Sequence, residues 1–174
     1  LDERFPERLL TPRDYQAAKE ALEWEEYLDE EIGVQIRLWF YYYTLPDRDR
    51  ALGFLLEGAP WYGRLLYPLI YPKVRSAMTD HMNINAASAK QAQERMLAAL
   101  ERLDSVLKER RFLVADSFTR ADLTACALLS PYCASGKSDA QFSAAFPTEV
   151  CSLRDQHKNR PFFNWVRNMY QSYR

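Results

Sequence analysis

Apolar residues recur at intervals of three and four over most of this chain, which is the period of an α-helix. No segment alternates apolar and polar side chains with the two-residue period of a half-buried strand. The helical pattern is clearest over residues 11–46, 85–110 and 119–133. The pattern therefore predicts an all-α fold built as a helical bundle.

The first and longest of these segments, residues 11–46, is expected to begin at Thr11-Pro12-Arg13-Asp14. This string has the form of a capping box with proline at the favoured first helical position. Pro46 ends the segment, and Gly33 is the predicted point of bending or close approach. The acidic residues between Glu23 and Glu31 are expected to face solvent, or else a basic surface of a second subunit.

Residues 85–110 form the most clearly amphipathic segment, and the long first helix is its expected partner. Downstream of residue 133 the pattern predicts a turn at 136–139 and a short helix within 147–160. A last helix should begin at Pro161.

Residues 47–83 are harder to interpret, because they are interrupted by Gly58, Pro60, Gly63, Pro68 and Pro72. We expect short helical pieces at 48–57 and 61–79. The stretch from Trp61 to Pro72 is aromatic and aliphatic with a single charge. Buried packing is the preferred interpretation of this stretch, and an exposed contact patch for another domain is the alternative. A membrane surface ranks third, because the stretch lacks a basic face.

A helix start is encoded clearly before the segment 119–133. Thr119 is the expected N-cap, with its hydroxyl accepting the backbone N–H of Asp122 while the Asp122 carboxylate accepts the N–H of Thr119. Phe118 and Leu123 occupy the positions of a hydrophobic staple. The run that follows carries no charge on any face, so we expect this helix to be central and buried, with the Thr119–Asp122 capping box in a structural role.

Composition narrows the functional classes. The chain has 174 residues, 48% of them apolar, and a net charge of −1, so we expect one globular domain with neither nucleic acid nor a membrane as partner. Three cysteines without metal or redox spacing are expected to be core thiols in the reducing cytoplasm. No apolar run approaches the roughly 20 residues needed to cross a bilayer.

No catalytic constellation is visible in the sequence. His81 and His157 lie far apart and lack metal-ligand spacing, and no glycine-rich phosphate loop or nucleophile elbow occurs. We therefore expect no catalytic residue, no metal and no cofactor bound by this chain alone.

Three strings resemble one family. Arg-Phe-Leu-Val-Ala-Asp-Ser-Phe-Thr-Arg-Ala-Asp-Leu-Thr-Ala-Cys-Ala-Leu-Leu-Ser-Pro, at 111–131, is similar to the segment that opens the buried core helix of the glutathione transferase C-terminal domain. Leu-Asp-Glu-Arg-Phe-Pro-Glu-Arg-Leu-Leu, at 1–10, looks like the last turn and exit linker of that family's first domain. Residues 160–170 resemble its closing helix. One departure is Ala115, where the family commonly has glycine.

The resemblance implies that residues 1–10 are a remnant of the first domain and that 11–174 form the helical domain. In this family a thioredoxin-like N-terminal domain, absent from this sequence, binds glutathione and carries the residue that engages its thiol. The helical domain supplies the apolar wall for the second substrate, a small hydrophobic electrophile. By position along the first helix, the wall residues would be Ile36, Arg37, Phe40, Tyr41 and Tyr43. Family members commonly form homodimers.

Two functions follow from the resemblance. The parent protein is either a bacterial-type glutathione transferase that conjugates or reduces electrophiles, with glutathione as co-substrate, or a non-enzymatic interaction or regulatory protein with the same fold. A thiol-site Ser, Tyr or Cys in the first domain would favour the enzyme.

Overall fold

A computed structural model describes residues 9–56, 58–133 and 144–173, and every regular element in these ranges is helical. The sequence prediction of an all-α fold is confirmed. The elements are α1 (Tyr15–Leu28), η1 (Asp29–Gly33), α2 (Val34–Thr44), α3 (Arg48–Leu55), α4 (Trp61–His81), α5 (Ala86–Leu107), α6 (Arg120–Cys133), α8 (Thr148–His157) and α9 (Pro161–Tyr173).

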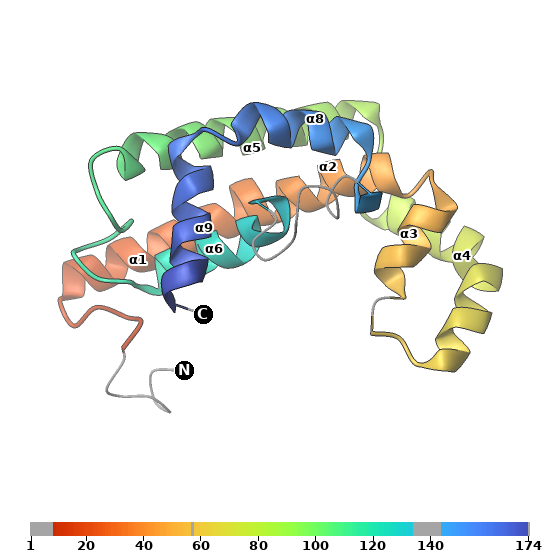
Figure 1. The fold of residues 1–174 in the computed structure, drawn as a ribbon, viewed down its shortest axis with the longest axis horizontal. Coiled ribbons are helices and arrows are strands. Elements are labelled where there is room, and N and C mark those ends of the chain that lie inside the picture. The colour runs from red at the N-terminus through yellow and green to blue at the C-terminus, as the bar shows by residue number, and fades with distance from the viewer. Residues whose placement is uncertain (1–8, 57, 134–143, 174) are drawn as a thin grey trace.

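The long first helix is real but begins later than expected. α1, η1 and α2 follow one another as one helical rod, with η1 as a single π-helical turn inside it (Figure 1). The N-cap is Asp14, whose carboxylate accepts the N–H of Ala17 at 2.9 Å. The predicted start at Thr11-Pro12 is wrong, because Asp14 is itself an extended, capping residue and the helical dihedrals begin after it. The long helix ends close to Pro46, as predicted, since α2 stops at Thr44.

Gly33 lies at the close approach that the sequence predicted. It is buried at the end of the π-helical turn, where a Cβ atom would meet Leu128 Cδ2 of α6 at 3.1 Å. A Cβ atom at this position would require the end of the Leu128 side chain to shift by a few tenths of an ångström. The absent side chain thus lets these two helices lie close together.

The bundle core forms where the long helix meets α5, α6 and α9. α5 packs along α2 and η1, as its amphipathic pattern predicted, and begins with a complete capping box between Asn85 and Ser88. α6 packs between α1 and α9 and is buried along most of its length, which confirms the predicted central helix. The predicted helices at 147–160 and from Pro161 are also confirmed as α8 and α9.

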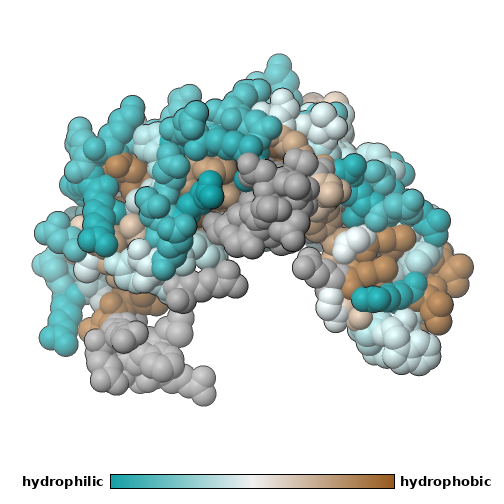
Figure 2. Space-filling model, in the orientation of Figure 1, coloured by the Kyte–Doolittle hydropathy of each residue, from teal (hydrophilic) through white to brown (hydrophobic). Residues whose placement is uncertain are grey.

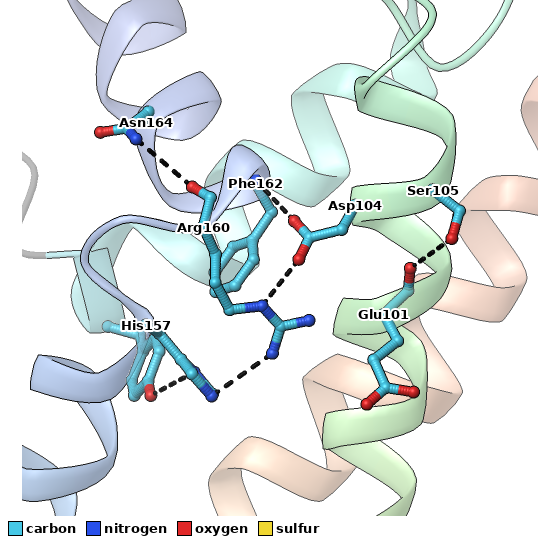
Figure 3. A network of polar contacts seen from close by, with 8 residues as sticks. Glu101, Asp104, Ser105, His157, Arg160, Phe162 and Asn164 are labelled. Atoms are coloured by element: carbon cyan, nitrogen blue, oxygen red, sulfur yellow. Dashed lines mark hydrogen bonds and ion pairs between the residues drawn. The ribbon is translucent and has the colours of Figure 1, made fainter.

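A buried polar network ties α5 to the start of α9 (Figure 3). The Asp104 carboxylate accepts the N–H of Phe162 at 2.8 Å and Nε of Arg160 at 2.7 Å, so it caps α9 from a neighbouring helix. The Arg160 guanidinium also lies 3.4 Å from Nε2 of His157. Nδ1 of His157 lies 2.9 Å from the hydroxyl of Tyr132. A carboxylate distant in sequence thus fixes where the last helix begins.

The α3–α4 hairpin stands at the end of the bundle farthest from the start of α1 (Figure 1). It has a small core of its own, which contains Leu45, Ala51, Leu52, Tyr71 and Ile84. The hydroxyl of Tyr71 donates to the carbonyl of Leu45, joining α4 to the end of α2. The hairpin is therefore joined to the end of α2, and α3 also contacts the bundle core through Phe54.

The helical pieces predicted at 48–57 and 61–79 are confirmed as α3 and α4, but α4 is one helix of 21 residues rather than a short one. The helix continues through Pro68 and Pro72, although each proline removes one backbone donor. Because Pro72 has no backbone N–H, the carbonyl of Pro68 has no helical partner. Nη2 of Arg48 on α3 donates to this carbonyl at 3.0 Å. The neighbouring helix thus supplies the hydrogen bond that the proline removed.

The preferred interpretation of the Trp61–Pro72 stretch as buried packing is also wrong. Only Gly63 and Tyr71 of α4 are buried; Tyr71 belongs to the small core that includes Ala51 and Leu52 of α3, and Gly63 lies among Ala59, Pro60 and Tyr67. The apolar side chains on the other side are in solvent, and Figure 2 shows hydrophobic surface gathered at this end of the molecule. The exposed residues are Trp61, Tyr62, Leu65, Leu66, Leu69 and Ile70.

Two sequence predictions fall outside the described residues. They are the turn at 136–139 and most of the remnant at 1–10.

Candidate functional site

An apolar pocket opens between α2, α3, α6 and the segment that leads into α8. Its volume is about 220 Å³, and apolar side chains form nearly all of its wall. The described lining residues are Ile36, Arg37, Trp39, Phe40, Phe54, Leu128, Pro131, Tyr132, Phe146 and Val150. A concave apolar site with few polar groups is the ordinary form of a small-molecule pocket.

Three phenylalanines from distant parts of the chain form one wall of the pocket. The ring of Phe40 meets that of Phe54 edge-on at 5.2 Å and that of Phe146 at 5.4 Å between centroids. Phe54 and Phe146 are themselves 5.2 Å apart. Because Phe54 belongs to α3, the hairpin segment contributes directly to the pocket.

Two of the lining residues are polar. Arg37 is exposed at the rim and forms no hydrogen bond or ion pair with any part of the chain that the structure describes. The Tyr132 hydroxyl is held by His157, and burial raises the pKa of this phenol well above its ordinary value. Tyr132 is therefore a neutral wall residue, and Arg37 provides the positive charge.

The structure brings together three of the five predicted wall residues. Ile36, Arg37 and Phe40 line the pocket because Phe40 lies four residues after Ile36 and three after Arg37, spacings that share one side of α2. Tyr41 packs on the α3–α4 core, with its ring 6.0 Å from that of Phe40, and is not among the lining residues. Tyr43 packs on the bundle core, with its ring 5.8 Å from Trp39. Neither tyrosine lines this pocket.

Sequence reasoning missed the lining residues outside α2. Leu128 and Pro131 lie in the uncharged run of α6, which was interpreted only as core. Phe54, Phe146 and Val150 come from segments whose pattern marks them merely as apolar. No local signal distinguishes a pocket wall from ordinary packing, because both need the same side chains.

The start of α6 forms a second site, which is polar. Asp122 is completely buried, and its carboxylate accepts the N–H of Thr119 at 2.8 Å, as predicted. The other half of the predicted box differs: the Thr119 hydroxyl donates to Asp122 Oδ2 at 2.9 Å. The second carboxylate oxygen accepts the N–H of Leu113 at 2.8 Å. Asp122 thus joins the incoming loop to the helix start. Leu123, predicted as half of a staple, is 39% exposed.

Burial controls the ionisation of groups around Asp122. It raises the pKa of the Asp122 carboxyl despite the hydrogen bonds from Leu113 and Thr119, which favour the charged form. Burial, with the nearby Asp122 charge, also raises the pKa of Cys126 to about 12. Burial likewise raises the pKa of Cys133. These two thiols are protonated core side chains rather than nucleophiles.

Within residues 9–56, 58–133 and 144–173, no three His, Cys, Asp or Glu side chains gather in a way that could hold a metal ion. In the same ranges no helix is both long enough and apolar enough to traverse a bilayer.

Comparison with known proteins identifies the family. The protein-family model of the glutathione S-transferase C-terminal domain matches residues 66–158 of the sequence, just over half of the chain. This chain belongs to the glutathione S-transferase family. Neither the curated proteins nor the solved structures contain a match. In this transferase-family domain, the matched region runs from within α4 through α8 and includes Leu128, Pro131 and Tyr132 of the pocket.

Proposed function

We propose that this domain supplies the second-substrate wall of a bacterial-type glutathione transferase that conjugates or reduces small hydrophobic electrophiles. The observation that carries the proposal is the apolar pocket, which has a single positive charge at its rim. Glutathione would bind to the thioredoxin-like first domain, which would also supply the residue that engages the thiol.

The wall residues have separate roles in this proposal. Phe40, Phe54 and Phe146 bind the apolar body of the electrophile through their rings and remove it from water. Arg37 is exposed and unpaired among the described residues, so its guanidinium is free to bind a carboxylate of glutathione. The pocket holds the electrophile beside the thiolate, and the domain itself donates no nucleophile.

We further propose a cytoplasmic homodimer with a role in detoxification. Glu26 and Glu30 of the predicted acidic face are exposed, whereas Glu25 and Glu31 pair with Arg120 and Arg95 of the same chain. That face is open to solvent or to a basic surface of a second subunit.

The decisive experiment uses the full-length protein with its first domain. Phe40→Ala should change kcat/KM about tenfold or more between a bulky aromatic and a small electrophile, because one wall ring is lost. The KM for glutathione should stay unchanged. Tyr42→Ala is the matched control, since Tyr42 packs on the α3–α4 core and is not among the residues that line the pocket. Equal losses for every electrophile, accompanied by a lower Tm, would show that Phe40 is only a packing residue.

Arg37→Gln tests the rim. Loss of the guanidinium should raise the KM for glutathione while leaving the selectivity among electrophiles unchanged. The 174-residue chain alone should show no turnover, since no described residue provides a nucleophile with its base.

The alternative, an interaction or regulatory protein with the same fold, has one observation in its favour, the exposed apolar face of α4. Absence of glutathione binding and of turnover in the full-length protein would favour that function.

A further inference from the structure

The outer face of α4 is apolar, exposed and uncovered by any described part of the chain. Trp61 is 75% exposed, Leu65 66% and Leu69 77%. Scattered single apolar residues are common on protein surfaces, but a contiguous apolar face of this kind marks an interaction site.

Helical spacing places these side chains in one stripe. Trp61, Leu65, Leu69 and Pro72 follow each other at intervals of three and four, on the side of α4 opposite to Gly63 and Tyr71. Tyr62 and Leu66 widen the stripe along one edge. The two sides of α4 thus differ in function, since the inner side packs on α3 and the outer side is free.

Cationic side chains border this stripe on both edges. Arg64 and Arg75, three turns apart, lie along one edge, and Lys73 lies along the other in line with Tyr62 and Leu66. All three cations are exposed. Residues 58–79 contain these cations and no acidic residue, although the whole chain has a net charge of −1. The stretch has no single basic face, but the helix places its cations along two edges of the stripe.

The hairpin presents this stripe as a firm projecting surface. Arg48 binds the Pro68 carbonyl and Tyr71 binds the Leu45 carbonyl, so α4 is fixed to α3 and to the end of α2. Figure 1 shows the hairpin projecting from one end of the bundle. A flat surface can therefore approach the outer side of α4.

We propose that α4 is an interfacial helix that binds the surface of an anionic phospholipid membrane. Trp61, Leu65 and Leu69 enter the boundary between headgroups and acyl chains. Arg64, Lys73 and Arg75 extend from the edges of the stripe to the lipid phosphates. The helix lies on the membrane and does not cross it, in accord with the absence of a spanning helix among the described residues.

The charges favour a membrane over a second copy of the chain. Antiparallel two-fold pairing of α4 would bring each basic edge against its own copy. Asp80, the acidic residue of α4, lies beyond the apolar stripe near the end of the helix. Pairing would therefore bury the apolar stripe at the cost of like-charge repulsion, whereas anionic headgroups complement both edges. This inference does not depend on the proposed enzymatic function.

Vesicle flotation of the 174-residue chain tests the proposal. The chain should float with phosphatidylcholine vesicles that contain phosphatidylserine, and much less with pure phosphatidylcholine or at high salt. The triple variant Arg64→Gln/Lys73→Gln/Arg75→Gln should partition on the order of a hundredfold more weakly. Leu65→Gln/Leu69→Gln should also lose binding, because the apolar part of the interaction is removed.

The matched control is Leu22→Gln/Val34→Gln, two exposed apolar residues on the bundle, 43% and 52% accessible. This variant should bind vesicles as the unmodified chain does. Circular dichroism and melting should show each variant folded. Failure of the unmodified chain to float with anionic vesicles would overturn the proposal, and so would equal loss in the control. A dimer in sedimentation velocity that Leu65→Gln/Leu69→Gln converts to monomer, without vesicle binding, would assign the face to a second copy.

Discussion

α4 and α6 look alike in sequence and differ in what covers them. Both are rich in apolar residues and contain proline within the helix. α6 packs between α1 and α9 and buries half of its residues, leaving only the edge with Leu123, Ala127 and Pro131 exposed, whereas α4 buries only Gly63 and Tyr71. Apolar composition therefore indicates that a helix will be buried against something. It does not indicate whether the burying surface belongs to the same chain.

The two helices also differ in how their first residues are held by the rest of the chain. α6 begins at a buried carboxylate that binds the incoming loop and the cap residue together. α4 begins after Pro60, which has no side chain able to cap it. The buried start makes α6 part of the cooperative bundle, while α4 depends on a few contacts at its base.

The largest expected effect comes from shortening one leucine side chain on α6, compared with the same change on α4. Leu129 is fully buried on α6, so Leu129→Ala should lower the free energy of unfolding by about 2–5 kcal/mol. Leu65 on α4 is 66% exposed, so Leu65→Ala should change it by less than about 0.5 kcal/mol. Urea denaturation of both variants measures the contrast. A large loss for Leu65→Ala would mean that another part of the protein covers α4.

Removing the buried cap should have the next largest effect. Asp122→Ala leaves the amides of Leu113 and Thr119 without an acceptor, and we expect a loss of about 2–3 kcal/mol. Asp122→Asn keeps one acceptor oxygen and should lose less. Thr119→Ala should cost about 1 kcal/mol, with the double variant below the sum, because both side chains support one turn. Additive losses in chemical denaturation would show that the two groups act independently.

Acid should weaken the bundle through His157. Burial, with Arg160 nearby, lowers the pKa of His157 from 6.5 to about 4. Between these values the unfolded chain binds a proton that the folded chain does not, so stability falls as the pH falls. Between pH 7 and pH 5 we expect a loss of roughly 2 kcal/mol from this residue. Urea denaturation at several pH values measures how the free energy of unfolding changes with pH. This dependence should be weaker for His157→Gln, and an unchanged dependence would rule out the contribution of His157.

The smallest effect concerns two residues with left-handed backbone. Ala115 (φ 54°) lies in the loop before α6, and Asn83 (φ 51°) follows α4. This conformation is unfavourable for alanine but readily adopted by asparagine. Ala115→Gly should therefore stabilise the chain by about 0.5–1 kcal/mol. Asn83→Gly should change stability by less than about 0.5 kcal/mol. Thermal melts of both variants check this, and no gain for Ala115→Gly would show that the loop relieves the strain.

Much of the fold was predictable because its determinants are local. The helical period, the end of the long helix near Pro46, the start of α9 at Pro161 and the close approach at Gly33 were all visible in neighbouring residues. Of the five wall residues predicted by their position along the first helix, Ile36, Arg37 and Phe40 line one pocket, and their role in binding a substrate stays a prediction. Tyr41 and Tyr43 do not line it, because position along a helix does not show which neighbour each side receives.

By itself, the sequence determined that this protein is helical, where most of its helices run, and that Asp122 supports the start of α6. Those properties depend on backbone geometry and on side chains a few residues apart. Only the tertiary structure decided that Phe54 and Phe146 join Phe40 in a pocket, that Asp104 caps α9, and that the outer side of α4 faces solvent. These depend on contacts between distant segments, because an apolar side chain has the same preference for burial whatever finally covers it.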